Sequence, residues 1–95
     1  MQRRRVVVLN GKRMDTREHA HSHLARRLRL PSWYGRNLDA LCDCLAEINV
    51  PTVILLRHVQ TLKDSLGDYG GKLLSALSAM TGENPNITLV VHRKF

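Results

Sequence analysis

Three carboxylates repeat at four-residue intervals in the middle of the chain, at Asp39, Asp43 and Glu47. Residues four apart lie above one another on an α-helix, so this spacing places the three side chains in one stripe. Like charges at this spacing repel each other mildly, and no Lys or Arg between Asn37 and Glu47 neutralises them. A basic protein that keeps such a stripe is expected to present it to a cationic partner. The alternative is an ordinary solvent-exposed face, on which only Asp39 gains from the helix dipole.

The same segment contains side chains that could do catalytic chemistry. Asp39 and Asp43 could act as a general acid and base, and Cys42 with a histidine could form a nucleophilic pair. Neither pair is accompanied by a glycine-rich site, a set of metal ligands or the pattern of a supporting pocket. We therefore expect a protein that is not an enzyme.

The two cysteines, Cys42 and Cys44, lie two residues apart, so on a helix they point to nearly opposite sides and do not pair easily. We expect reduced thiols, with Cys44 in or near the core and Cys42 nearer the carboxylates. A metal site would have to combine them with His19, His21 and His23. On a helix His21 points away from the other two histidines, so no complete ligand set forms locally. The sequence predicts neither a metal ion nor a cofactor.

A short loop and a helix must position the carboxylate stripe. Pro31 and Gly35 mark the loop, because proline fixes its own backbone and glycine accepts conformations that other residues avoid. Asn37 is a favourable N-cap for the helix that follows. Leucines then recur at helical spacing up to Leu45, which predicts a stripe that the helix buries.

The run from Pro31 to Leu45 is specific enough to indicate a family. Its central part closely resembles the signature of the barstar family of intracellular ribonuclease inhibitors, and reads Trp33-Tyr34-Gly35-Arg36-Asn37-Leu38-Asp39-Ala40-Leu41-Cys42-Asp43-Cys44-Leu45. The resemblance extends more weakly over almost the whole chain. It implies a barstar-like α/β fold, in which a three-stranded parallel sheet is packed with about four helices. It also implies that the peptide bond before Pro51 can be cis.

The resemblance implies a mechanism as well. In the family, the loop and the following helix block the active site of a ribonuclease, and carboxylates of the inhibitor meet the basic groups that hold RNA phosphates. Carried over to this sequence, Asp43 is the principal anionic anchor and Asp39 a second carboxylate. Asn37 could instead serve only as the helix cap, and Trp33 could pack partly on its own domain. The residues implied to contact the partner are Trp33, Gly35, Arg36, Asn37, Leu38, Asp39, Cys42, Asp43 and Glu83.

Four positions depart from the family pattern. Cys42 replaces an aromatic contact residue, Ala79 occupies the position of an acidic contact, Ile48 lacks an expected aromatic ring, and Arg36 places a cation inside the loop. These changes reduce charge and contact area at the implied interface. We therefore hypothesise an extracellular-type microbial ribonuclease whose active site is cationic but whose remaining surface is acidic, with Arg36 meeting an acidic residue on its rim. We expect a monomer when free and a 1:1 complex.

The composition sets wider limits. The chain has 95 residues, of which 43% are hydrophobic and 24% charged, which indicates a single domain with a modest core. The resemblance implies that this domain, over residues 1–95, is barstar-like. No apolar run is as long as a membrane span. The run Val6–Leu9 is too short for the apolar region of a signal peptide, so we expect a cytoplasmic protein with no role at a membrane.

The net charge of +7 leaves two other classes of function open. Arg3–Arg5 and Arg26–Arg29 could form a basic patch that binds nucleic acid, with Trp33 or Tyr34 stacking on bases. Aromatic residues make up only 4% of the chain and no nucleic-acid-binding motif is recognised. The sequence therefore favours a protein partner over a nucleic acid. The second alternative is a regulatory module that uses the same fold to dock another protein.

Periodicity and cap residues predict the remaining elements. Asp15 with Glu18 resembles a capping box, so a helix should begin near Thr16 and end near Leu28. Strands are expected over Arg5–Leu9, Val53–Leu56 and Ile87–Val91. Two further helices are expected, over Val59–Leu66 and from Leu73 to Met80. The glycines predict a break between these helices over Gly67–Gly71 and an end of the second helix at Gly82. Strands that alternate with helices favour a parallel sheet. The continuous apolar run of the first strand is typical of a strand covered on both faces.

Overall fold

The computed structural model describes residues 4–92 as an α/β fold with a three-stranded sheet and four α-helices. Both strand pairs are parallel, and the second strand lies between the other two. The predicted fold class is therefore confirmed. In chain order the elements are β1 (Arg5–Asn10), the 3₁₀ turn η1 (Gly11–Arg13), α1 (Arg17–Leu28), α2 (Leu38–Ala46), β2 (Thr52–Arg57), α3 (Val59–Leu66), α4 (Asp68–Glu83) and β3 (Ile87–Val91).

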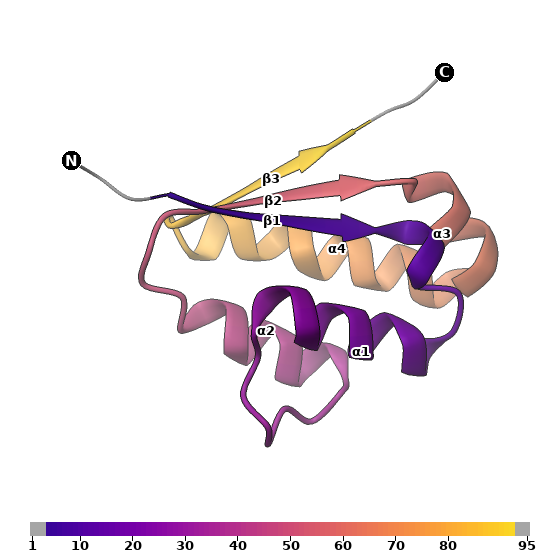
Figure 1. Ribbon diagram of the computed structural model, residues 1–95, viewed down its shortest axis with the longest axis horizontal. Coiled ribbons are helices and arrows are strands. Elements are labelled where there is room, and N and C mark those ends of the chain that lie inside the picture. The colour runs from indigo at the N-terminus through magenta and orange to yellow at the C-terminus, as the bar shows by residue number, and fades with distance from the viewer. Residues whose placement is uncertain (1–3, 93–95) are drawn as a thin grey trace.

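The helices lie on one side of the sheet (Figure 1). On that side the strand residues Leu9, Ile54 and Leu56 are buried in the core. The opposite face is open, and Val6 is 61% exposed there while Val90 is 44% exposed. The prediction that the first strand is covered on both faces is therefore wrong. An apolar strand shows that its side chains can be buried, but it does not show how many layers are present to bury them.

The helices contribute leucines to the same core. In α2, Leu41 and Leu45 are completely buried, as their four-residue spacing predicts. In α1 and α4 the corresponding residues are Leu24, Leu28, Leu73 and Leu77. Burying one such side chain contributes about 1.5–3 kcal/mol to folding, so these stripes fix which face of each helix remains outside.

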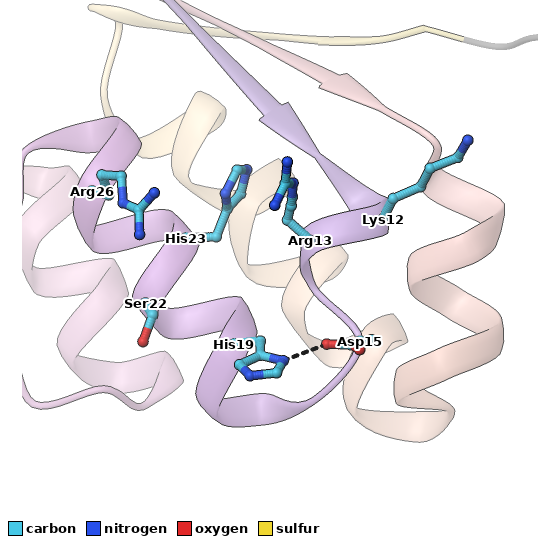
Figure 2. A pocket seen from close by; sticks show the side chains of 7 residues that line it. All are labelled: Lys12, Arg13, Asp15, His19, Ser22, His23 and Arg26. Atoms are coloured by element: carbon cyan, nitrogen blue, oxygen red, sulfur yellow. Dashed lines mark hydrogen bonds and ion pairs between the residues drawn. The ribbon is translucent and has the colours of Figure 1, made fainter.

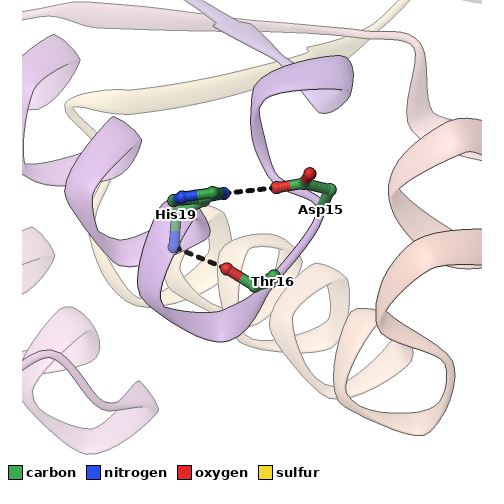
Figure 3. Close-up of polar contacts among 3 residues, drawn as sticks. All are labelled: Asp15, Thr16 and His19. Carbon is green, nitrogen blue, oxygen red and sulfur yellow. Dashed lines mark hydrogen bonds and ion pairs between the residues drawn. The ribbon is translucent and has the colours of Figure 1, made fainter.

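The first helix begins and ends where its pattern predicts, but a different residue caps it. Thr16 is the N-cap, and its hydroxyl accepts a hydrogen bond of 3.0 Å from the backbone N–H of His19. Asp15 does not take part in a capping box with Glu18. Its carboxylate lies 2.6 Å from Nδ1 of His19 instead (Figure 3).

The junction between α3 and α4 is shorter than the three glycines predict. Gly67 alone has a positive φ, of 59°, and α4 begins at the next residue and continues through Gly82 to Glu83. A break over Gly67–Gly71 and a stop at Gly82 are therefore wrong. Gly70 is buried within α4, where an added Cβ would lie 3.3 Å from Leu62 and from the backbone of α3. Its small size lets the two helices pack closely.

The peptide bond before Pro51 is trans, and the described chain from 4 to 92 has no cis peptide bond. The cis bond implied by the family resemblance is therefore not present. Pro51 leads into β2, and its carbonyl accepts a hydrogen bond of 2.8 Å from the backbone N–H of Arg5.

Candidate functional site

The outer face of α2 carries Asp39 and Asp43 of the predicted carboxylate stripe, and Glu47 follows the helix directly as its C-cap residue. Asp39, Asp43 and Glu47 are exposed, because the buried leucines of the same helix point to the opposite side. Within residues 4–92, no carboxylate lies within the 4.0 Å ion-pair limit of a Lys or Arg, and the one ion pair joins Asp15 to His19. The negative charges of α2 are therefore not neutralised by direct contacts inside the described chain.

Asn37 connects the loop to the start of α2. Its Oδ1 atom accepts a hydrogen bond of 2.7 Å from the backbone N–H of Ala40, and its Nδ2 atom donates to the carbonyl of Gly35 at 3.3 Å. The predicted N-cap is confirmed, and such a cap contributes about 1 kcal/mol. Both ends of the amide are occupied, so Asn37 also fixes the path of the chain into the helix.

The residue with unusual backbone geometry in this loop is Arg36 rather than Gly35. Arg36 has a φ of 55°, in the left-handed region that favours glycine, whereas Gly35 does not have a positive φ. The guanidinium of Arg36 donates a hydrogen bond of 2.8 Å to the hydroxyl of Ser22 on α1, which helps to hold this conformation. Gly35 lies in a tight space, because an added Cβ would lie 3.2 Å from Cβ of Ala40.

A buried histidine holds the loop from beneath. His21 on α1 is 2% exposed, and its Nδ1 atom lies 2.6 Å from the hydroxyl of Tyr34 in the loop. Its Nε2 atom lies 2.6 Å from the hydroxyl of Tyr69 on α4. The guanidinium of Arg17 packs over the ring of Tyr69, 4.1 Å from its centroid. The first helix, the loop and α4 therefore meet at one imidazole.

The protonation states of this network follow from its burial. Burial lowers the pKa of His21, and the nearby charges of Arg36 and Arg17 lower it further. Burial also raises the pKa of Tyr34 well above its ordinary value, so the phenol keeps its proton. A neutral imidazole carries one N–H, so it donates to one tyrosine oxygen and accepts from the other. Both ring nitrogens and both hydroxyls are then satisfied.

Trp33 belongs to the same loop and is 77% exposed, although it also lines a pocket of its own domain. Arg5, Arg29 and Ile48 line the same pocket.

The predicted basic patch is divided between two pockets, because Arg5 and Arg29 line this pocket whereas Arg26 lines a different cleft. Arg3, which was expected to join it, lies outside the described residues.

An open groove of about 980 Å³ runs along one side of α2, between this helix and α3 and α4. Leu38, Asp39 and Cys42 form its α2 side, so three of the predicted contact residues border one surface.

Cys42 is half-buried and Cys44 is buried, and both thiols are free, as predicted. Burial raises the pKa of Cys42, and the charges of Asp39 and Asp43 raise it further, so the group is a neutral thiol rather than a nucleophile.

Glu83 is the last residue of α4 and is exposed. The side chain of the next residue, Asn84, donates hydrogen bonds of 2.9 Å to the carbonyls of Leu45 and Ile48. These bonds hold the end of α4 against the end of α2. Glu83 therefore lies near the carboxyl-terminal end of α2, whereas Asp39 lies in its first turn. Ala79 is exposed on α4, at a position where the family pattern has an acidic residue.

The sequence pattern did not reveal the polar contacts that hold the site. The two tyrosine partners of His21 lie 13 and 48 residues away in the sequence. Likewise, no local signal links Arg36 to Ser22. The helix, its cap and its charged face could be predicted because each depends on neighbouring residues.

The fold and this surface define an α/β protein with a barstar-like architecture, in which an acidic second helix follows a loop tied to α1. The family described as Barstar (barnase inhibitor) matches residues 4–92, and the chain belongs to that family. The chain is also 32% identical over 74 residues to the Bacillus subtilis (strain 168) protein named "Putative ribonuclease inhibitor YrdF", an alignment that covers 77% of this chain and 81% of that protein. In the described residues, none of the helices has the length and apolar character needed to cross a membrane.

Proposed function

We propose that this protein inhibits a secreted microbial ribonuclease by blocking its active site with α2 and the preceding loop. The observation that carries this proposal is the set of exposed carboxylates on α2, none of which is paired with a cation of the described chain. A ribonuclease must hold RNA phosphates with cationic groups, and carboxylates at one-turn intervals can occupy those groups instead. Membership of the barstar family and the name of the Bacillus relative support this class of function.

In this proposal each residue of the surface has a role set by its position. Asp43 lies in the middle of the exposed face and is the principal anionic contact, with Asp39 one turn before it. Trp33 supplies exposed aromatic surface, which is the type of side chain that most often dominates protein interfaces. The remaining proposed contacts are Gly35, Arg36, Asn37, Leu38, Cys42 and Glu83. The protein acts by binding and does not catalyse a reaction.

The charge distribution favours a particular kind of target. The chain carries a net charge of +7, yet the proposed contact helix is acidic. A ribonuclease with a cationic active site and an acidic surface around it would be attracted by both regions. Arg36 is exposed at the edge of the loop, where it can meet an acidic residue of the rim. We propose a cytoplasmic monomer that forms a 1:1 complex with such an enzyme.

Titration of a panel of microbial ribonucleases, both basic and acidic, tests the proposal. We expect the protein to abolish the activity of at least one enzyme at an equimolar ratio. The association rate with that enzyme should fall as ionic strength rises, because attraction between charges is screened by salt. Failure to inhibit any member of the panel would contradict the proposed function. A rate that does not depend on salt would leave inhibition in place but remove the argument about the charge of the target.

A further inference from the structure

A cleft of about 340 Å³ lies between η1 and α1, and it shares no lining residue with the groove beside α2 (Figure 2). Three exposed cations line it, namely Lys12, Arg13 and Arg26. Figure 2 shows the side chains of Arg13 and Arg26 on either side of His23, whereas the side chain of Lys12 extends away from them. The cleft therefore concentrates positive charge around one imidazole.

Within residues 4–92, the cations of this cleft have no partner of opposite charge. The one carboxylate of its wall is Asp15, which is held by His19 at 2.6 Å (Figures 2 and 3). None of the three cations forms an ion pair with a described residue. Burial lowers the pKa of His23, and the charges of Arg27, Arg26 and Arg13 lower it further, which shows that several cations act on this position. A bound anion would relieve their mutual repulsion.

The hydrogen bond of His23 fixes its tautomer. Its Nε2 atom lies 2.9 Å from the backbone nitrogen of Asn10, and a backbone N–H can only donate. Nε2 is therefore the acceptor, and the proton of the neutral ring is on Nδ1. This N–H has no hydrogen-bond partner in residues 4–92, so it is available to a ligand.

The backbone around the cleft is already held in place. The side chain of Asn10 accepts a hydrogen bond of 3.0 Å from the backbone N–H of Lys12, which starts the η1 turn. Gly11 is buried against the backbone of His58, where an added Cβ would lie 2.1 Å from the carbonyl oxygen. A ligand would therefore meet a preformed arrangement, so little binding energy is spent on ordering the backbone.

We propose that this cleft is a binding site for a phosphate group, held by Arg13, Arg26 and the Nδ1–H of His23. Two guanidinium groups and a neutral N–H donor match an oxyanion with several acceptor oxygens and more than one negative charge. A carboxylate, with two oxygens and one charge, would leave part of this donor set unused. The ligand is inorganic phosphate or the phosphate group of a nucleotide or an RNA end. The site does not depend on whether α2 binds a ribonuclease.

Calorimetric titration at constant ionic strength tests this site with sodium phosphate as the probe and sodium chloride as the reference. Arg13→Gln and Arg26→Gln each remove one cation of the cleft. Arg29→Gln is the matched control, because it changes the net charge equally but lies on a different pocket. All three side chains are exposed, and none makes a hydrogen bond with a described residue, so the variants should fold. We expect saturable 1:1 binding that weakens at least tenfold in the two cleft variants and is unchanged in the control.

A short RNA with and without a 5′-phosphate distinguishes the two sources of the ligand. Saturation by phosphate alone supports a site for the free ion. Saturation only by the 5′-phosphorylated RNA supports a site for a nucleotide or RNA end. The proposal is overturned if no phosphate compound saturates the protein. It is also overturned if both RNAs bind equally and Arg29→Gln weakens them as much as the cleft variants, since that result describes diffuse attraction to a polyanion.

Discussion

The hydrogen bond between Tyr34 and His21 allows a quantitative test of how the loop before α2 is held. Replacing Tyr34 with Phe removes the hydroxyl that lies 2.6 Å from Nδ1 of His21. His21 is 2% exposed and Tyr34 is 6% exposed, so water has little access to replace the lost partner. Leaving a buried polar atom unsatisfied costs about 1–3 kcal/mol. We expect Tyr34→Phe to lower the free energy of unfolding by about 2 kcal/mol, and Tm by about 8–16 °C.

Tyr69→Phe is the matched control for this measurement. It removes the other hydrogen bond of the same imidazole, at an equal distance, but Tyr69 is only half-buried. Water can replace its hydroxyl more easily, so we expect a loss of less than about 1 kcal/mol. Urea unfolding should be followed by far-ultraviolet circular dichroism. The fluorescence of Trp33 is a poor reporter because its ring is 77% exposed in the folded protein.

A double-mutant cycle separates the network from other effects of the substitution. In a His21→Leu background, Tyr34→Phe should cost much less than it does in the wild-type chain, because the partner of the hydroxyl is already absent. The reasoning is refuted if Tyr34→Phe is no more costly than Tyr69→Phe. It is also refuted if the cost of Tyr34→Phe is the same with and without His21.

Three further predictions concern the fold. Arg29 is the C-cap of α1 and has a φ of 55°, which glycine adopts without strain. Arg29→Gly should therefore be more stable than Arg29→Ala by about 1 kcal/mol, and equal stabilities of the two variants in urea would contradict this. Gly11→Ala should lose about 2–3 kcal/mol because its Cβ would meet the carbonyl of His58. Gly71→Ala, with nothing near its Cβ, should gain about 0.5–1 kcal/mol, and a loss for both glycines would refute the packing argument. The lowered pKa of His21 means that the unfolded chain binds its proton first as the pH falls below 6.5. Stability should therefore decrease from pH 7 to 5.5, by at most about 1.4 kcal/mol per pH unit from this group, and a flat profile would contradict the assignment.

Features that depend on neighbouring residues could be predicted from the sequence. Asn37 caps α2, and the spacing of Leu41 and Leu45 fixes which side of this helix is buried. The same helical spacing places Asp39 and Asp43 on the exposed side, so the acidic face could also be predicted. The contacts made by that face depend on the structure of a complex with the partner, so the contact residues remain predictions.

Features that depend on contacts between elements could not be predicted. Gly70 lies within α4 and packs against Leu62 and Lys63 of α3, a contact between two helices that no local propensity reveals. The positive φ of Arg36 is supported by Ser22, and the buried ring of His21 by two tyrosines from other elements. The open sheet face, with Val6 exposed, results from the number of helical layers. In each case the deciding contact comes from another element of the fold.

The measurement that tests the central claim most directly compares two variants that each neutralise one exposed carboxylate. Asp43→Asn changes the middle of the α2 face, and Glu18→Gln changes the first turn of α1. Both should be assayed against a ribonuclease that the wild-type protein inhibits. Loss of one partner of a desolvated charge pair costs about 2–5 kcal/mol, so Asp43→Asn should weaken inhibition about 30- to 4,000-fold, whereas Glu18→Gln should change it little. Equal inhibition by the two variants would contradict the assignment of α2 as the inhibitory face.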